Sequence, residues 1–136
     1  MIKGIGHLAF RVSDLEKSLN FYCNVLGLKE AFRLYNDAGE LWIVYLKINN
    51  DNFIELFPYK GEIESNYERS SYQHLCLLVD DINETLRELS ERGLDIKGTP
   101  NQGKDGNYQY WITDPDGNRI ELMQIMPNSL QAKARD

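Results

Sequence analysis

Two histidines and two glutamates are the residues of this 136-residue chain whose types and spacing suggest chemistry. His7 and His74 are its only histidines, and Glu55 and Glu121 follow them by 48 and 47 residues. Each glutamate lies between Ile and Leu in an apolar segment, where an ionised carboxylate is costly to bury unless it has a partner. The near-equal spacing predicts a duplicated unit that holds a metal site of two imidazoles and two carboxylates.

The predicted cofactor is one divalent metal ion per site, because this set of ligands suits Ni²⁺, Zn²⁺, Co²⁺, Mn²⁺ or Fe²⁺. One or two positions would remain open for water or substrate oxygens. The ion would then act as a Lewis acid and stabilise an enediolate formed from a substrate with adjacent oxygens. A carboxylate ligand that the substrate displaces would become a local base. Taken singly, a strand histidine is more often a hydrogen-bonded rim residue and a strand glutamate a solvated one, but their recurrence favours the metal site.

Strand parity predicts that the four residues lie on equivalent sheet faces. Side chains alternate between the two faces of a strand, so His7, Ala9 and Arg11 share one face and Leu8, Phe10 and Val12 the other. By the same alternation, Glu55, His74 and Glu121 each lie on the face of their strand opposite its apolar face. The apolar faces suit packing under a helix. We interpret Arg11 as a group that binds an anionic part of the substrate, with a surface charge as the alternative.

The segments that position these residues are expected to follow the order β-α-β-β-β twice. Apolar alternation predicts the strands, and Asp and Gly residues mark the starts and ends of the helices. The first copy comprises the strand 5–12, a helix from its cap Asp14 to about Leu26 with Gly27 closing it, and the strands 29–34, 41–48 and 53–57. The second comprises the strand 73–79, a helix from a capping box at Asp81 to Arg92, and the strands near 95–97, at 108–113 and at 118–124.

The predicted fold class is α+β, with two tandem βαβββ modules forming a curved mixed sheet. We expect a single domain over residues 1–136, with module 1 at about 4–57, a linker at 58–71, module 2 at about 72–125 and a tail at 126–136. The end of this tail, 127–136, is expected to be polar or a short helix. A repeat of this length is too short for two independent domains, so the modules would pair, either within one chain or between chains.

Composition excludes several functional classes. A hydrophobic content of 42% is enough for a core, so disorder is not expected. The net charge of −6 and the absence of a basic run argue against nucleic acid and anionic membrane as partners. No apolar stretch reaches about 18 residues, and the N-terminus lacks the apolar region of a signal peptide, so we expect a cytoplasmic protein.

Cys23 and Cys76 are interpreted as buried free thiols. The walls of a core or cleft are expected to include Trp42, Trp111, Tyr108 and Tyr110.

Further motifs accompany the four candidate ligands. They are His7-Leu8-x-x-x-Val12-x-Asp14, Ser18-x-x-Phe21-Tyr22-x-x-Val25-Leu26-Gly27, Phe53-Ile54-Glu55-Leu56, His74-x-x-x-x-Val79-Asp80-Asp81 and Asp114-Pro115-Asp116-Gly117-Asn118-x-Ile120-Glu121. With them, residues 4–125 resemble the vicinal oxygen chelate superfamily, which includes glyoxalases, bleomycin-resistance proteins and dioxygenases. Within it, the chain is most similar to bacterial glyoxalase I.

This resemblance implies a homodimer of paired βαβββ modules, with a nickel- or zinc-type metal between subunits. It also implies lyase activity, in which Glu121 moves a proton between the carbons of a hemithioacetal through an enediolate at the metal. The metal ligands would be His7, Glu55, His74 and Glu121. Glu55 would be the carboxylate of module 1 that corresponds to Glu121 of module 2. Arg11 matches an arginine that helps hold glutathione, but Tyr59 stands where the family has an asparagine, so the resemblance leaves the small-molecule substrate open.

Other functions of the same superfamily compete with the lyase. An extradiol dioxygenase would require a further histidine, which the chain lacks. A fosfomycin-modifying thiol transferase would leave an apolar residue in place of Glu55. A metal-free module that sequesters a small drug is the alternative from a different class, and the presence of all four candidate ligands argues against it.

Overall fold

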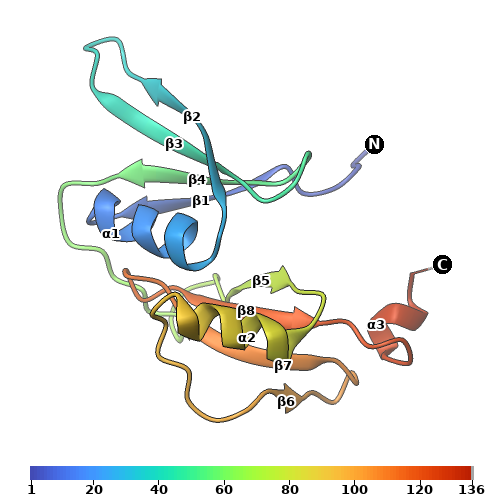
Figure 1. The fold of residues 1–136 in the computed structure, drawn as a ribbon. Helices are drawn as coiled ribbons and strands as arrows, with labels where there is room; N and C mark the ends of the chain where they lie inside the picture. The colour runs from blue at the N-terminus through green and yellow to red at the C-terminus, as the bar shows by residue number, and fades with distance from the viewer. Residues whose placement is uncertain (136) are drawn as a thin grey trace. The chain divides into compact units, whose positions relative to one another are not determined.

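A computed structural model describes residues 1–135, and in it the chain divides into two compact units (Figure 1). The first unit covers Met1–Glu64, and the second begins at Ser65. Each unit contains one four-stranded mixed sheet and follows the order β-α-β-β-β. The expected α+β class with two βαβββ repeats is therefore confirmed.

The first unit orders its strands β1-β4-β3-β2, with β1 parallel to β4 and the other neighbours antiparallel. Helical residues bury one face of this sheet, where Phe10 stacks on Tyr22 with ring centroids 6.3 Å apart. The elements are β1 (His7–Val12), the α-helix α1 (Leu15–Leu19), the π-helix η1 (Asn20–Val25), β2 (Lys29–Tyr35), β3 (Leu41–Lys47) and β4 (Phe53–Pro58).

The predicted helix from Asp14 to about Leu26 is present, but its second half is wider than an α-helix. The Asp14 carboxylate accepts a hydrogen bond from the Lys17 amide at 3.1 Å and caps the first turn. The Leu26 amide then donates to the Phe21 carbonyl, five residues back, at 2.9 Å. Gly27 follows with φ of 82°, a conformation that favours glycine, and ends the helix.

The second unit repeats this topology in the order β5-β8-β7-β6, with β5 parallel to β8 and the other neighbours antiparallel. Ile82, Leu86 and Leu89 lie on one face of the helix α2 and are buried. The elements are β5 (Leu75–Leu78), α2 (Ile82–Glu91), β6 (Asn101–Gln102), β7 (Tyr108–Thr113), β8 (Arg119–Gln124) and α3 (Leu130–Lys133).

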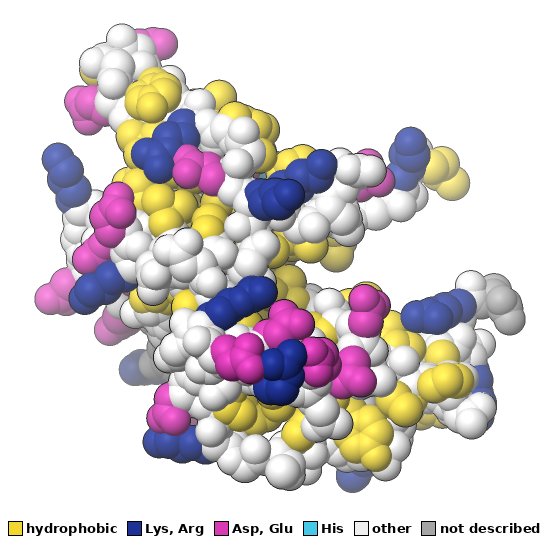
Figure 2. Space-filling model, viewed as in Figure 1, with side chains coloured by type: hydrophobic (Ala, Val, Ile, Leu, Met, Phe, Trp, Pro, Cys, Tyr) yellow, Lys and Arg dark blue, Asp and Glu magenta, His cyan; other side chains and the backbone are white. Residues whose placement is uncertain are grey.

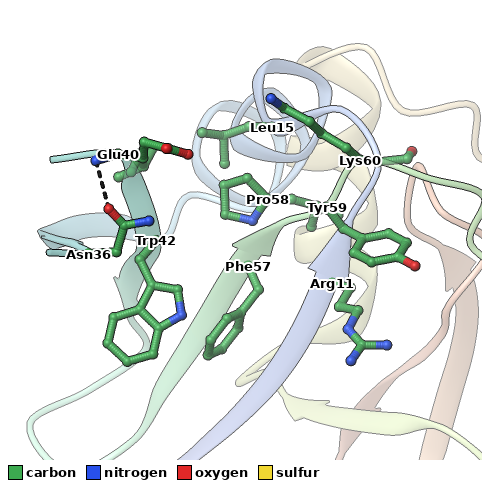
Figure 3. Close-up of a pocket in the computed structure, with 12 residues that line it drawn as sticks. Arg11, Leu15, Asn36, Glu40, Trp42, Phe57, Pro58, Tyr59 and Lys60 are labelled. Atoms are coloured by element: carbon green, nitrogen blue, oxygen red, sulfur yellow. Dashed lines mark hydrogen bonds between the residues drawn. The ribbon is translucent and has the colours of Figure 1, made fainter. Parts of the chain in front are cut away.

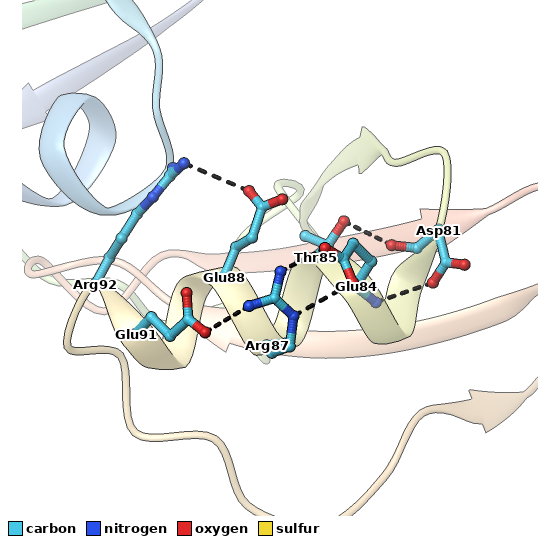
Figure 4. A network of polar contacts seen from close by, with 7 residues as sticks. All are labelled: Asp81, Glu84, Thr85, Arg87, Glu88, Glu91 and Arg92. Carbon is cyan, nitrogen blue, oxygen red and sulfur yellow. Dashed lines mark hydrogen bonds and ion pairs between the residues drawn. The ribbon is translucent and has the colours of Figure 1, made fainter.

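The outer face of α2 is held by its cap and by ion pairs (Figure 4). The Asp81 carboxylate accepts from the Glu84 amide at 2.9 Å, as the predicted capping box requires. The Glu84 carboxylate does not return to Asp81 but pairs with Arg87, which also pairs with Glu91. Figure 2 shows acidic and basic side chains side by side over this helix, where they form a solvated face.

The prediction of a strand near residues 95–97 is wrong. The Tyr110 hydroxyl accepts a hydrogen bond from the Lys97 amide at 2.8 Å and donates one to the Lys97 carbonyl at 3.0 Å. One side chain thus satisfies both backbone groups that a neighbouring strand would need. The strand forms later instead, where Gln102 of β6 lies opposite Tyr108 of β7.

The C-terminal segment contains the short helix α3, one of the two forms expected for 127–136; Asp136 lies outside the described residues. Buried Asn107 holds this segment, because its side chain donates to Gln131 at 3.0 Å and accepts from the Met126 amide at 2.9 Å. None of the helices in residues 1–135 has the length and apolar character needed to cross a bilayer.

Candidate metal centre and ligand cavity

His7 and Glu55 meet on the sheet of the first unit. Strand β1 pairs with β4 so that Ala9 lies opposite Glu55, which places the two side chains on the same face. Nε2 of His7 lies 3.2 Å from Oε2 of Glu55. The histidine is exposed, whereas Glu55 is only 5% exposed, so a buried carboxylate faces an accessible imidazole.

His74 and Glu121 form the equivalent pair in the second unit. Cys76 lies opposite Glu121 in the β5–β8 pairing, and His74 precedes β5 directly. Nε2 of His74 lies 3.0 Å from Oε2 of Glu121, which is 8% exposed. Nδ1 of His74 is buried and has no hydrogen-bond partner within residues 1–135.

The two pairs have the same construction, with the histidine two residues before the position opposite the glutamate. Neither carboxylate forms an ion pair with Lys or Arg within residues 1–135. Two buried carboxylates and two imidazoles without other cationic partners fit a divalent cation, which would offset the cost of burying the charges. Within either unit, the described His, Cys, Asp and Glu side chains form no group of three or more that could hold a metal. A site with all four residues therefore requires both units and stays a prediction.

Two further residues touch the carboxylates, and sequence reasoning missed these contacts. The Tyr45 hydroxyl donates a hydrogen bond to Glu55, which raises the pKa of Tyr45 above its usual value. Burial and then the charge of Glu121, with a hydrogen bond between the two side chains, raise the pKa of the Cys76 thiol to about 12. Cys76 is therefore a neutral thiol beside Glu121. Alternation within the predicted strand 41–48 is a signal that could place Tyr45 on one face, but its contact with Glu55 depends on the register between β3 and β4.

Aromatic and cationic side chains support the second pair. The Trp111 ring contacts the His74 ring edge-on at 4.7 Å between centroids. The Arg119 guanidinium lies over Trp111 at 4.5 Å and over Tyr67 at 4.4 Å, and it donates to the Gln73 side chain at 3.1 Å. Arg119 thus connects this stack to the side chain of Gln73, the residue directly before His74. The expectation that Trp111 forms a wall of a core or cleft stays a prediction.

Arg11 lies at the end of β1, on the His7 face, and lines a cavity of about 560 Å³ (Figure 3). Its guanidinium sits over the Tyr59 ring at 5.2 Å. The cavity lies in the first unit, and its walls combine aromatic and aliphatic side chains with polar and charged ones. The lining residues are Arg11, Val12, Ser13, Leu15, Asn36, Glu40, Leu41, Trp42, Phe57, Pro58, Tyr59 and Lys60.

Comparison with known proteins identifies the class to which this fold and these residue pairs belong. The family model of the Glyoxalase/Bleomycin resistance protein/Dioxygenase superfamily matches residues 4–122. The chain therefore belongs to this superfamily.

Individual relatives carry differing descriptions. The chain is 32% identical over 123 residues to a probable lactoylglutathione lyase of Synechocystis sp., covering 87% of this chain and 92% of the relative. It is 29% identical to the uncharacterized protein YwkD of Bacillus subtilis, covering 91% and 98%. A crystal structure of a superfamily member from Sphaerobacter thermophilus matches with a TM-score of 0.72 at 27% identity, covering 91% and 98%. The superfamily is thus established, whereas the relatives do not agree on one activity.

Proposed function

We propose that this protein is a metal-dependent lyase or isomerase of the glyoxalase I type. In this proposal His7, Glu55, His74 and Glu121 together hold one divalent ion, of the nickel, zinc, cobalt, manganese or iron type. The observation that carries it is the repeated pairing of a buried carboxylate with an imidazole, once in each unit at 3.2 and 3.0 Å. The similarity to a probable lactoylglutathione lyase supports the choice of reaction.

When bound, the ion would supply Lewis-acid stabilisation of the negative charge that develops on the substrate oxygens. Glu121 is the residue that we propose to move the proton, from the carbon that carries the hydroxyl of a hemithioacetal-like substrate to the adjacent carbon. This transfer converts a carbonyl and a hemithioacetal into an α-hydroxy thioester without a net change in atoms. Glu55 is the equivalent carboxylate of the first unit, and the hydrogen bond that it accepts from Tyr45 orients it.

Burial of the carboxylates supports these roles. A carboxylate at 5–8% exposure is shielded from water, so its hydrogen bonds and its interaction with developing charge are stronger than at the surface. The neutral Cys76 thiol beside Glu121 and the Tyr45 hydroxyl beside Glu55 hold each carboxylate without neutralising it. Arg11 is proposed to bind the anionic part of the substrate.

We further propose a homodimer. The strand β2 is an edge strand of its sheet and is exposed along its whole length, including Phe32, Leu34 and Tyr35. An exposed edge with apolar side chains is a surface that proteins usually cover.

A binding module that sequesters a small molecule is the second candidate, and the aromatic cavity near Arg11 favours it. The two functions differ in what Glu121 does. For a lyase, the carboxylate is needed for turnover, whereas a sequestering module would bind its ligand equally well without it.

Substitution of Glu121 by Gln tests the proposal. The metal-loaded protein is first screened with α-oxoaldehydes and several thiols for formation of a thioester. Glu121→Gln should retain metal by elemental analysis but lose turnover by at least about 100-fold, because an amide cannot accept the proton. Glu64→Gln, at an exposed position, is the matched control and should keep full activity. Equal activity of wild type and Glu121→Gln would refute the proposed role, and absence of turnover with every substrate would favour the sequestering module.

A further inference from the structure

The cavity of the first unit combines three aromatic rings, two cationic side chains and one carboxylate in one small space. Figure 3 shows Trp42 beside Phe57, with Arg11 and Tyr59 on the other side of Phe57. The cavity volume of about 560 Å³ is within the range of small-molecule sites. We propose that this cavity binds the part of the substrate remote from the reacting carbons, and that this part is an aromatic ring carrying one carboxylate.

Trp42 and Phe57 form the ring-binding corner. Their ring centroids are 6.4 Å apart and their planes meet at 80°, so the corner presents the face of one ring and the edge of the other. Trp42 is 52% exposed, which leaves apolar surface for a ligand to cover. A planar arene can stack on one ring and meet the other edge-on, the two arrangements that aromatic pairs prefer.

Arg11 supplies the anion-binding end within reach of that corner. It lies directly opposite Phe57 in the β1–β4 pairing, and paired strands are about 4.8 Å apart. A carboxylate one or two bonds from an arene spans a comparable distance, so both groups of the ligand can be held together. Tyr59 covers one face of the guanidinium, and the side chain of Arg11 has no ion-pair partner within residues 1–135. Its N–H groups are therefore available to a carboxylate.

The remaining charges favour a monoanion. Lys60 and Glu40 also line the cavity, so together with Arg11 they leave one net positive charge. Figure 3 shows the Glu40 carboxylate directed toward Leu15, at the end away from Arg11. Lys60 also directs its nitrogen toward Leu15, so it offsets Glu40 at that end and Arg11 is left as the unbalanced cation, which a ring carrying a single carboxylate would neutralise.

The position of the cavity connects it with the candidate metal centre. Phe57 follows Glu55 by two residues on the same face of β4, a separation of roughly 7 Å along the strand. A substrate whose reacting carbons lie at Glu55 can therefore reach the corner with a substituent of one ring. The assignment of this part to a substrate rests on the proposed function, but the binding of the aromatic anion itself does not require metal.

Calorimetric titration of metal-free protein with phenylacetate tests the proposal. Cyclohexylacetate has the same charge without the arene, phenylacetamide has the ring without the charge, and glutathione is a flexible anionic thiol without a ring. Phenylacetate should bind at least about 5-fold more tightly than each of them. Equal binding of cyclohexylacetate, or tighter binding of glutathione, would overturn the aromatic assignment.

Substitutions locate the site. Arg11→Gln should weaken phenylacetate about 5- to 10-fold and leave phenylacetamide unchanged, while Trp42→Leu should remove the preference over cyclohexylacetate. Arg33→Gln removes the same charge outside the cavity and should bind phenylacetate like wild type. An equal loss in Arg11→Gln and Arg33→Gln would refute the site. Because these titrations need neither metal nor turnover, their failure is distinguishable from failure of the lyase proposal.

Discussion

At the scale of single residues, Trp111 matters because it contacts a histidine whose second ring nitrogen has no hydrogen-bond partner in residues 1–135. Metal-binding histidines usually donate this second N–H to a carboxylate, a carbonyl or water, which fixes the orientation of the ring. His74 lacks such a partner, but the edge-on contact with Trp111 at 4.7 Å restricts its rotation. Arg119, stacked on Trp111, holds the indole in turn. Trp111 is thus a positioning residue for the imidazole.

We expect Trp111→Leu to weaken binding of Zn²⁺ or Ni²⁺ about 10-fold, the lower end of the effect of removing an outer partner of a ligand. The unfolding temperature of the metal-free protein should change little, because the indole is partly exposed. Competition with a chelator measures the affinity, and Trp42→Leu is the matched control, which should keep wild-type affinity. The same metal affinity in all three proteins would contradict this role.

At the scale of elements, the helix α2 depends on its N-terminal cap more than on its surface charges. The Asp81 carboxylate satisfies the Glu84 amide, which has no partner within the helix. The ion pairs of Arg87 with Glu84 and Glu91 are exposed, and such pairs contribute little to stability in water. The three apolar residues of α2 bury the sheet face behind Glu121, so the cap indirectly supports the strand of the candidate ligand.

Asp81→Ala should lower the free energy of unfolding by about 1 kcal/mol, the usual cost of removing a helix cap. For a chain of this size the unfolding temperature should fall by roughly 3–5 °C. Asp80→Ala is the matched control, because Asp80 is an exposed neighbour outside the helix. A thermal scan monitored by circular dichroism measures both, and a control that falls as far as Asp81→Ala would show that general charge, rather than the cap, is responsible.

At the scale of the whole molecule, the proposal of one ion for all four ligands predicts that the two units depend on each other for metal binding. Each unit contains only one imidazole and one carboxylate in contact, and neither pair by itself is a complete ligand set. If one ion binds all four groups, loss of either histidine should impair the whole site. If each pair bound its own ion, the units would act independently.

We therefore expect one ion per chain in the wild type, and a loss of most of the metal in His7→Ala and in His74→Ala alike. Metal content after gel filtration, measured by elemental analysis, distinguishes the two arrangements. Retention of half of the metal in each single variant would contradict a shared ion. The same chromatography reports the oligomeric state, for which we expect a dimer.

The sequence by itself was sufficient to predict the fold class and the face on which each candidate ligand lies. Alternation along a strand and the capping of a helix depend on residues close together in the chain, so they can be read directly. This is why the burial of Phe10 and Val12 opposite His7, and the caps at Asp14 and Asp81, agree with expectation.

Only the tertiary structure decided which side chains touch the two carboxylates and where the cavity lies. The contact of Tyr45 with Glu55 depends on the register of β3 against β4, and the segment 95–97 is held by the distant Tyr110 instead of a strand. Likewise, Arg11 lies opposite Phe57 because β1 and β4, which are far apart in the chain, pair side by side, and Phe57 in turn contacts Trp42. These features depend on packing between distant segments, which local sequence patterns do not encode.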